Sequence, residues 1–198
     1  MKNEPTLKTK NRSFDALGAF AAEMKAMSDA HNAGDIDVQM PEEKFEGIYK
    51  TMAKGVNDMV NGHITVKKKA MACVAEFAKG NYDAELEKFP GKKAFINETI
   101  EPLRVAVKAL IAETKGLSEG AVAGRLATRA DASKHQGDYR KIVQGVNDTL
   151  DAVIGPLNVS AKYVDQISKG DIPAKITETY KGDFNEIKNN LNMCIDAI

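Results

Sequence analysis

The chain has 198 residues with 28 basic and 28 acidic side chains, so no overall charge favours nucleic acid or an anionic membrane. No apolar run approaches the ~18 residues of a membrane span, no signal peptide opens the chain, and Cys73 and Cys194 match no metal or redox spacing, which together favour a cytoplasmic segment. Tryptophan is absent, and glycine and proline fall in clusters rather than at the close spacing of a β-sandwich, so we expect an all-α fold.

The first predicted helix follows a mildly basic tail over residues 1–12, which we expect to be flexible. Apolar residues then recur at helical spacing: Phe14, Leu17, Ala21 and Met24. Gly34 offers a positive-φ helix stop and opens the connector "AGDIDVQMPEEKFEG", after which the next helix begins "IYKTMAKGVNDMV".

The second helix continues through an apolar stripe at Val66, Ala70, Cys73 and Phe77. Gly80 then opens "KGNYDAELEKFPGKKAFINETI", in which "INETI" takes the place of the later "VNDTL", so this connector looks about six residues shorter than the others. A third helix follows, with apolar or small residues at Ile96, Ile100, Leu103, Val107, Leu110, Thr114, Leu117 and Ala121.

The last two connectors run from Gly124 in "AGRLATRADASKHQG" and from Gly170 in "KGDIPAKITETYKG". The helices after them carry the residues predicted to form a dimer seam: Tyr139, Ile142, Val146, Leu150, Val153, Leu157, Val164 and Ile167, then Phe184, Ile187, Leu191 and Cys194. The final stripe is still in register at Ile198, so we expect the helix to run on into a C-terminal output module of a longer protein.

The four connector glycines, Gly34, Gly80, Gly124 and Gly170, recur with a period of about 45 residues. Each is followed two positions later by an apolar residue: Ile36, Tyr82, Leu126 and Ile172. Such a period is typical of one supersecondary unit repeated in tandem. We divide the chain into units at residues 13–62, 63–101, 102–155 and 156–198.

The apolar positions step by 3.5 residues on average, which is the coiled-coil period. So narrow a stripe needs a second wall, and a parallel homodimer is preferred over a bundle folded on itself. Thirteen extended residues span about 40 Å, whereas a 16-residue helix needs about 24 Å. Each connector can therefore run back along its helix, so that the two helices of a unit are parallel and the apolar residue after the glycine acts as a clasp.

This pattern resembles the HAMP domain family, and the wording of the repeats ("GVNDTLDAVIGPL", "FPGKKAFINETIE", "KGDFNEIKNNLN") is similar to the poly-HAMP region of bacterial methyl-accepting chemotaxis proteins. The resemblance covers residues 13–198. It implies parallel four-helix coiled-coil bundles made by two protomers, which pass conformational signals from an upstream sensor to a downstream signalling domain. Gly34, Gly80, Gly124 and Gly170 would take the connector-glycine role, and Ile36, Tyr82, Leu126 and Ile172 the clasp role.

The chain departs from the family where the second helix of a unit opens. Relatives often carry Asp-Glu there, whereas this chain has Glu46-Gly47, Gln136-Gly137 and Lys181-Gly182. Only the first unit keeps an acidic residue there, Glu46.

No catalytic, cofactor or metal site is expected, because His31, His63 and His135 are scattered and lack partners at metal-ligand spacing. We therefore predict a non-enzymatic relay without cofactors, which contacts neither nucleic acid nor membrane. Small residues in the seams and the interior prolines Pro102 and Pro156 would allow two packings of similar free energy. Two alternatives remain open: a structural coiled-coil spacer, and a ligand-sensing helical bundle around the small residues 116–124.

Overall fold

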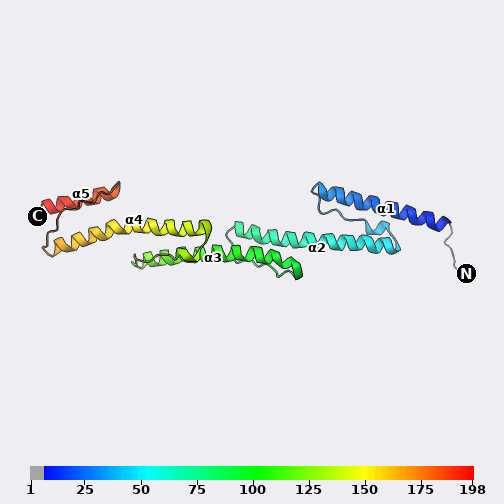
Figure 1. Ribbon diagram of the computed structural model, residues 1–198, viewed down its shortest axis with the longest axis horizontal. Helices are drawn as coiled ribbons and strands as arrows, with labels where there is room; N and C mark the ends of the chain where they lie inside the picture. Colours follow the sequence, from blue (N-terminus) through cyan, green and yellow to red (C-terminus); the bar gives the residue numbers. More distant parts are fainter. Residues whose placement is uncertain (1–6) are drawn as a thin grey trace. The chain divides into compact units, whose positions relative to one another are not determined.

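The computed structural model describes the backbone of residues 7–198 and the side chains from residue 14 onward. Five helices follow one another (Figure 1): α1 (Leu7–Asn32), α2 (Gly47–Ala78), α3 (Phe95–Val122), α4 (Gly137–Ser168) and α5 (Asp183–Asp196). Three connectors contain one 3₁₀ turn each: η1 (Glu42–Lys44), η2 (Gly91–Ala94) and η3 (Ala132–Lys134). No strand occurs between residues 7 and 198, which confirms the all-α fold.

Helix α1 begins earlier than the sequence predicts. Residues 7–12 were expected to belong to a flexible tail, but they form the first turns of α1. The segment from Leu7 to Phe14 contains neither glycine nor proline, so nothing in it breaks a helix that its apolar residues stabilise further along. Residues 1–6 of the predicted tail lie outside the described residues.

The structure divides into two compact units, residues 1–101 and 102–198, and each is considered by itself. In the first unit, α1 and α2 run in the same direction, and the connector between them returns along their length (Figure 1). The core between them is formed by Phe20 and Met27 of α1, Met40 and Phe45 of the connector, and Ala53 of α2. The connector therefore supplies two of the five buried residues of this core.

A second core in the first unit lies farther along α2. It joins Ala70, Cys73 and Phe77 of α2 to Ile100 of α3, with Tyr82 packed against it from the connector. The rings of Phe77 and Tyr82 are 5.1 Å apart. One long helix thus ends one helix pair and begins the next.

The second unit, residues 102–198, repeats this arrangement with α4 as the shared helix. The connector at residues 123–136 joins α3 to α4, and the connector at residues 169–182 joins α4 to α5. Within this unit, α4 and α5 again run in the same direction (Figure 1). Pro102 and Pro156 stand inside α3 and α4, and neither proline ends its helix.

The stretch between helix ends is not shorter in the second connector, although the spacing of its glycines and asparagine is. It extends from residue 79 to residue 94, whereas the other three each span 14 residues, 33–46, 123–136 and 169–182. Between its first and second glycine, Gly80 and Gly91, the second connector is two residues shorter than the first, and the stretch from Gly91 to Asn97 of "INETI" is four residues shorter than that from Gly47 to Asn57. Separately, none of the helices within residues 7–198 is long and apolar enough to cross a bilayer.

Candidate functional site: the connector latch

Each connector begins with the same glycine-dependent helix stop. Gly34, Gly80, Gly124 and Gly170 have φ values of 100°, 85°, 73° and 77°. In the first unit, the N–H of Gly34 donates to the carbonyl of His31 at 3.0 Å, and that of Asp35 donates to Ala30 at 2.9 Å. The same pair of bonds closes α2, α3 and α4. This is the Schellman motif, so the four glycines do end the helices as their positions in the sequence predict.

A second glycine stands at the other end of each connector. Gly47, Gly91, Gly137 and Gly182 have φ values of 55°, 56°, 54° and 56°. The conformation is strained for any residue with a Cβ, and it turns the chain into the following helix.

An asparagine of the following helix fastens each connector in place. Asn57 accepts the N–H of Met40 at 2.9 Å and donates to the carbonyl of the same residue at 3.0 Å. Asn147 holds Ala130 in the same way at 3.0 and 2.8 Å, and Asn192 holds Ile176 at 2.8 and 3.0 Å. We call these residues, together with Asn97, the latch asparagines.

The latch of the second connector is a variant. Asn97 accepts the N–H of Phe89 at 3.0 Å but donates to the carbonyl of Glu87 at 2.8 Å, so its two bonds go to different residues. Asn97 also lies only six residues after its glycine, Gly91, whereas Asn57 lies ten residues after Gly47. This shift accounts for four of the roughly six residues by which the connector looks short in the sequence.

The residues held by the asparagines are buried. Met40 is 2% exposed, Phe89 and Ile176 are 4% exposed, and Ala130 is 7% exposed. A buried, extended segment outside any sheet leaves its backbone polar groups without partners unless a side chain supplies them. Asparagine carries both a donor and an acceptor, so a single amide satisfies one N–H and one carbonyl beside a buried residue of the connector.

We call Met40, Phe89, Ala130 and Ile176 the anchors. The four predicted clasp residues are less buried than these anchors. Tyr82 packs against the α2–α3 core, whereas Ile36, Leu126 and Ile172 remain 41–42% exposed. Their clasp role stays a prediction, because a second protomer would have to cover them. Sequence reasoning missed the latch asparagines and the anchors, although the asparagine ten residues after the second glycine was visible as part of the repeat.

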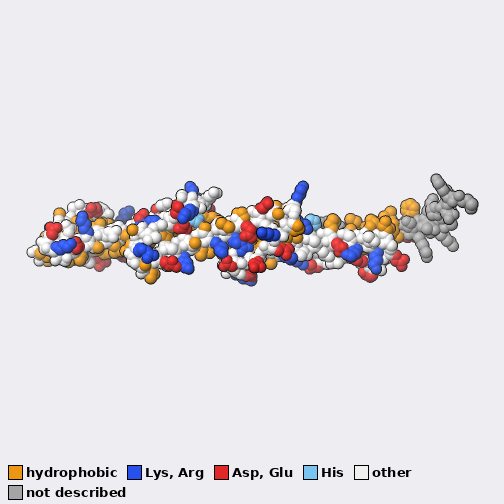
Figure 2. All heavy atoms as spheres, turned by 90° about the horizontal axis from the view of Figure 1, so that it is seen from below, with side chains coloured by type: hydrophobic (Ala, Val, Ile, Leu, Met, Phe, Trp, Pro, Cys, Tyr) orange, Lys and Arg blue, Asp and Glu red, His pale blue; other side chains and the backbone are white. Residues whose placement is uncertain are grey.

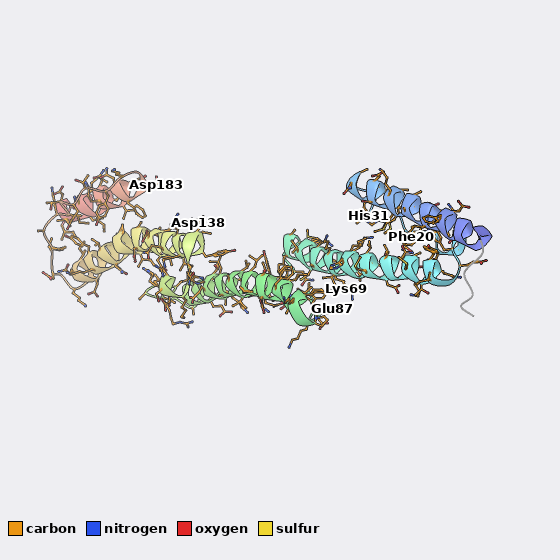
Figure 3. All side chains as sticks on the ribbon, turned by 45° about the vertical axis from the view of Figure 1, so that its right-hand side comes forward. Phe20, His31, Lys69, Glu87, Asp138 and Asp183 are labelled. Atoms are coloured by element: carbon orange, nitrogen blue, oxygen red, sulfur yellow. The ribbon has the colours of Figure 1, made fainter. Side chains whose placement is uncertain are left out.

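Ion pairs reinforce the connectors from outside. Lys44 and Glu23 are 2.6 Å apart, Lys134 and Glu113 3.4 Å apart, and Lys69 and Glu87, labelled in Figure 3, 2.6 Å apart. Lys68 lies 2.8 Å from Asp37 and lowers the pKa of that carboxyl through a hydrogen bond and its charge. Because these pairs are exposed, each contributes little to stability.

The predicted seam residues are covered unequally within this single chain. On α5, Phe184, Ile187 and Leu191 are half-buried and Cys194 is exposed, and on α4 Tyr139, Leu150 and Ile167 are half-buried. Ile142, Val146, Val153, Leu157 and Val164 are all exposed. The face of α4 turned toward its own connector carries different residues: Val143, Asn147 and Ile154. Figure 2 shows hydrophobic side chains at the surface of the first unit as well.

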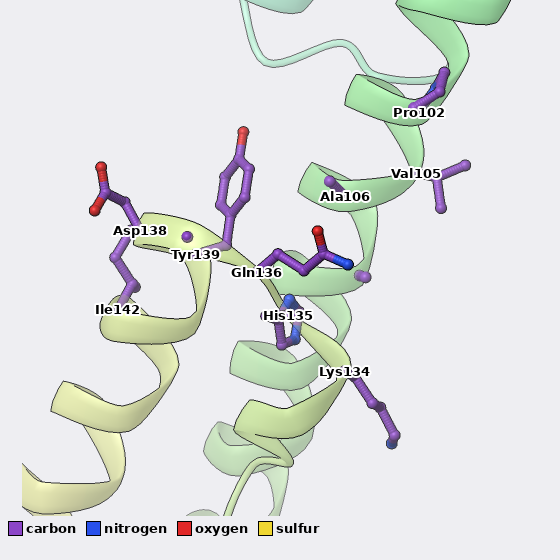
Figure 4. Close-up of a pocket in the computed structure, with 11 residues that line it drawn as sticks. Pro102, Val105, Ala106, Lys134, His135, Gln136, Asp138, Tyr139 and Ile142 are labelled. Carbon is purple, nitrogen blue, oxygen red and sulfur yellow. The ribbon is translucent and has the colours of Figure 1, made fainter.

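An open groove of the second unit is lined by α3, by the end of the connector and by the first turn of α4 (Figure 4). Its α3 wall is Pro102, Val105, Ala106 and Ala109. Among the described residues, no three His, Cys, Asp or Glu side chains are grouped so that they could hold a metal ion. Around residues 116–124, Gly120 makes room for the connector: a Cβ there would lie 3.0 Å from the Thr128 hydroxyl.

The fold therefore defines a class of protein built from tandem units, each with two parallel helices and a latched connector. Residues 134–198 match the HAMP domain, residues 66–108 match HAMP N-terminal domain 3, and residues 15–62 match the second HAMP domain of methyl-accepting chemotaxis protein McpB. The chain belongs to the HAMP domain family, as a poly-HAMP region of the type found in methyl-accepting chemotaxis proteins. The resemblance drawn from the sequence is confirmed.

Methyl-accepting chemotaxis protein McpB of Pseudomonas aeruginosa is 32% identical to this chain over 126 residues. The match covers 63% of this chain and 19% of McpB. The chain thus spans about a fifth of that relative.

Proposed function

We propose that this chain is a non-enzymatic relay that passes conformational change from the sensor to the signalling domain of a chemoreceptor. In this proposal two copies associate in parallel, and each HAMP unit becomes a four-helix bundle with two packings of similar free energy. The family membership supports the signalling role. The observation that carries the proposal is that all four connectors are held by a latch asparagine, while the apolar stripe along α4 remains exposed.

Burial within one chain supports the need for a second copy. Among the residues whose side chains are described, 14 apolar residues are buried, whereas 22 large apolar residues are exposed. Several of the exposed ones continue one heptad stripe along α4, and a contiguous apolar face of this kind marks an interaction surface. A second copy would supply the missing wall, because the same stripe repeats on it.

The latch supports a relay rather than a passive spacer. A spacer requires only continuous helices, yet each unit keeps a connector with two positive-φ glycines and an asparagine that binds its backbone. Such a connector couples the second helix of a unit to the first without making the pair a rigid rod. A relay needs elements of this kind, since input can shift only an equilibrium between states that lie close in free energy.

The test places a charge at a predicted clasp in the full-length receptor. Leu126→Glu and Ile172→Glu should lock or abolish output, because a carboxylate cannot be buried against a second copy without a large desolvation cost. Ala127→Glu is the matched control, since Ala127 is exposed on the same connector and directly follows the clasp residue Leu126. Normal switching in both clasp variants, measured as receptor-controlled kinase activity, would contradict the relay mechanism.

A further inference from the structure

A second pair of side chains joins three of the connectors to the following helix, one turn beyond the latch asparagine. On the connector it uses the residue just before the anchor, and on the helix the residue four positions after the asparagine. We call these the outer pairs. They are Gln39 and Asn61 at 3.3 Å, Arg129 and Asp151 at 2.6 Å, and Lys175 and Asp196 at 2.6 Å. The same positions of the second unit hold Lys88 and Glu101, which are also opposite in charge.

The place of the outer pairs follows from the geometry of the connector and of the helix. In an extended segment, neighbouring side chains point to opposite sides, so the residue before a buried anchor faces outward. On the helix, residues four positions apart lie on the same face. The outward residue of the connector therefore meets the helix one turn beyond the asparagine that holds the anchor.

The chemistry of the outer pair differs between the first and third units, whose sequences align with an offset of 90 residues. The neutral amides Gln39 and Asn61 of the first unit become the ions Arg129 and Asp151 of the third. Gln39 donates one hydrogen bond of 3.3 Å. Arg129 donates to Asp151 from its Nε at 2.9 Å and from its Nη2 at 2.6 Å. A charged pair thus joins the third connector to α4, where the first connector has one long amide contact.

The guanidinium of Arg129 is also bound to its own connector. Its Nη1 donates to the carbonyl of Leu126, the predicted clasp residue, at 2.8 Å and to that of Thr128 at 2.7 Å. The Arg129 side chain is only 26% exposed, whereas that of Lys175 is 53% exposed. Because a planar guanidinium is fixed by several acceptors at once, this pair keeps a defined geometry that most surface ion pairs lack.

The apolar core beneath the third connector is smaller than that beneath the first. With the same offset of 90 residues, three core residues of the first unit, Phe20, Met40 and Phe45, are replaced by the smaller or more polar Leu110, Ala130 and His135. Met27 becomes Leu117, of similar size, and Ala53 becomes the larger Val143. Less apolar burial therefore holds the third connector, and its charged contacts carry a larger part of the stabilisation.

The other ion pairs of the two connectors do not produce this difference. The pair between Lys134 and Glu113 has a direct equivalent in the first unit, so it acts on both connectors. The first unit also pairs Lys68 with Asp37, but these side chains are 59% and 78% exposed. An ion pair exposed to that extent contributes little to stability.

We infer that ionic strength regulates the third connector, because salt screens the attraction between Arg129 and Asp151 and loosens this connector before the first one. The screening length falls from about 10 Å at 0.1 M salt to about 3 Å at 1 M. Apolar burial, which dominates beneath the first connector, does not depend on attraction between charges. The third unit is thereby the place at which a change in salt concentration acts on the chain without a bound ligand.

The backbone amides of Met40 and Ala130 report the state of the first and third connectors, because each donates to its latch asparagine. Their hydrogen exchange in the whole chain can be followed by NMR at 0.1 M and 1 M NaCl and divided by the intrinsic chemical rate in each solution. Protection of Ala130 should fall about threefold at the higher salt concentration, while that of Met40 stays constant. The readout does not involve signalling output, so it succeeds or fails independently of the proposed relay.

Exchanging the outer pairs between the two units tests the cause. The double variant Arg129→Gln, Asp151→Asn gives the third unit the amide pair of the first and should abolish the salt effect at Ala130. The reverse variant Gln39→Arg, Asn61→Asp should create a salt effect at Met40.

An exposed ion pair of the same unit provides the matched control. Lys141→Gln removes the pair with Asp138, whose side chains are 80% and 87% exposed, and should leave the salt effect at Ala130 unchanged. The inference would be overturned by constant protection of Ala130 in the wild type or by an equal fall at Met40. A salt effect that persists at Ala130 in the Arg129→Gln, Asp151→Asn variant would overturn it as well.

Discussion

At the scale of single residues, the latch asparagines provide the hydrogen-bond partners that the connector backbone would otherwise lack, because the connector belongs to neither a helix nor a sheet. Asn57 is 2% exposed and binds both backbone groups of Met40, and its Nδ2 also donates to Glu42 at 3.0 Å. Because the anchor is buried, removing the amide leaves a backbone N–H and a carbonyl without partners. The cost is then the desolvation of two groups rather than the loss of two exchangeable hydrogen bonds.

The third-unit asparagine offers a direct test of this. Asn147→Leu keeps a side chain of similar size but removes both bonds to Ala130, so we expect the free energy of unfolding to fall by about 2–4 kcal/mol. Asn147→Asp should also destabilise, since a carboxylate keeps the acceptor for the N–H but faces the Ala130 carbonyl with negative charge. Urea unfolding followed by circular dichroism measures both.

The exposed Asn190 of α5 provides the matched control, and Asn190→Leu should change the free energy of unfolding by less than about 0.5 kcal/mol. Equal stabilities for Asn147→Leu and Asn190→Leu would mean that the asparagine does not hold the connector.

An ion pair supplies a second residue-scale prediction, with a defined sign in pH. Lys68 lowers the pKa of Asp37, so the pair stabilises the folded state above the ordinary pKa of an aspartate and loses this effect as the pH falls through the lowered value. Lys68→Gln should raise the pKa of Asp37 toward the ordinary value, as measured by NMR titration of the carboxyl carbon. The neighbouring Lys67→Gln should leave that titration in place; equal shifts in the two variants would contradict the pairing.

At the scale of elements, a connector is bounded by two glycines that do different jobs. The first lets the preceding helix close with a Schellman motif, and the second turns the chain into the next helix. No side chain or backbone atom lies within 4 Å of where a Cβ would be placed on Gly124 or Gly137. Backbone conformation rather than space therefore accounts for glycine at these two positions.

The same substitution should consequently have opposite effects at two glycines of the second unit. Gly124→Ala forces a Cβ into a φ of 73° and should cost about 1–2 kcal/mol. Gly145→Ala, in the interior of α4 with the same open surroundings, should stabilise by about 0.5–1 kcal/mol because alanine favours the helix.

Thermal unfolding of the two glycine variants beside the wild type provides the measurement. Asparagine tolerates the left-handed conformation, so Gly124→Asn should recover part of the loss. A stabilised Gly124→Ala variant would show that the positive φ is dispensable.

The sequence predicts these elements well because their signals are local. Helical stripes and the glycine after each stripe lie within a few residues of the feature that they determine. The connector anchors escaped prediction because burial of Met40 or Ile176 depends on which helix turn the returning chain meets, and that is a long-range property. The exposed Ile36 and Ile172 are as apolar as the buried anchors, so composition alone could not separate the two sets.

At the scale of the whole molecule, the apolar surface sets the main physical constraint. The exposed stripe along α4 repeats on a second copy, so a symmetric parallel pair would cover both stripes at once. Each large side chain covered would contribute about 1.5–3 kcal/mol. A single heptad of such contacts is already comparable to the net stability of a small domain.

A charge placed in this stripe should separate the two copies. Val153→Asp would bury two unpaired carboxylates near the axis of a parallel dimer, at a cost of several kcal/mol, and should weaken association at least about 100-fold in sedimentation equilibrium. Gln144→Asp is the control, since Gln144 is an exposed residue of α4 outside the stripe. Equal dissociation constants for the two variants would show that Val153 does not lie in the interface.

The orientation of the pair can be tested with the native cysteines. Cys194 is exposed, whereas Cys73 is buried, so mild oxidation should select Cys194. In a parallel pair each residue of the stripe meets its own counterpart across the axis, which brings the two Cys194 side chains together; in an antiparallel pair they lie at opposite ends. We therefore expect rapid formation of a disulfide-linked dimer that Cys194→Ser abolishes and Cys73→Ser does not.

Because Val153→Asp acts on association and not on the thiol, it should slow cross-linking at low protein concentration and permit it at high concentration. Cross-linking that is absent while sedimentation shows a dimer would exclude the parallel arrangement, and with it the coupling of four bundles in series on which the proposed relay depends.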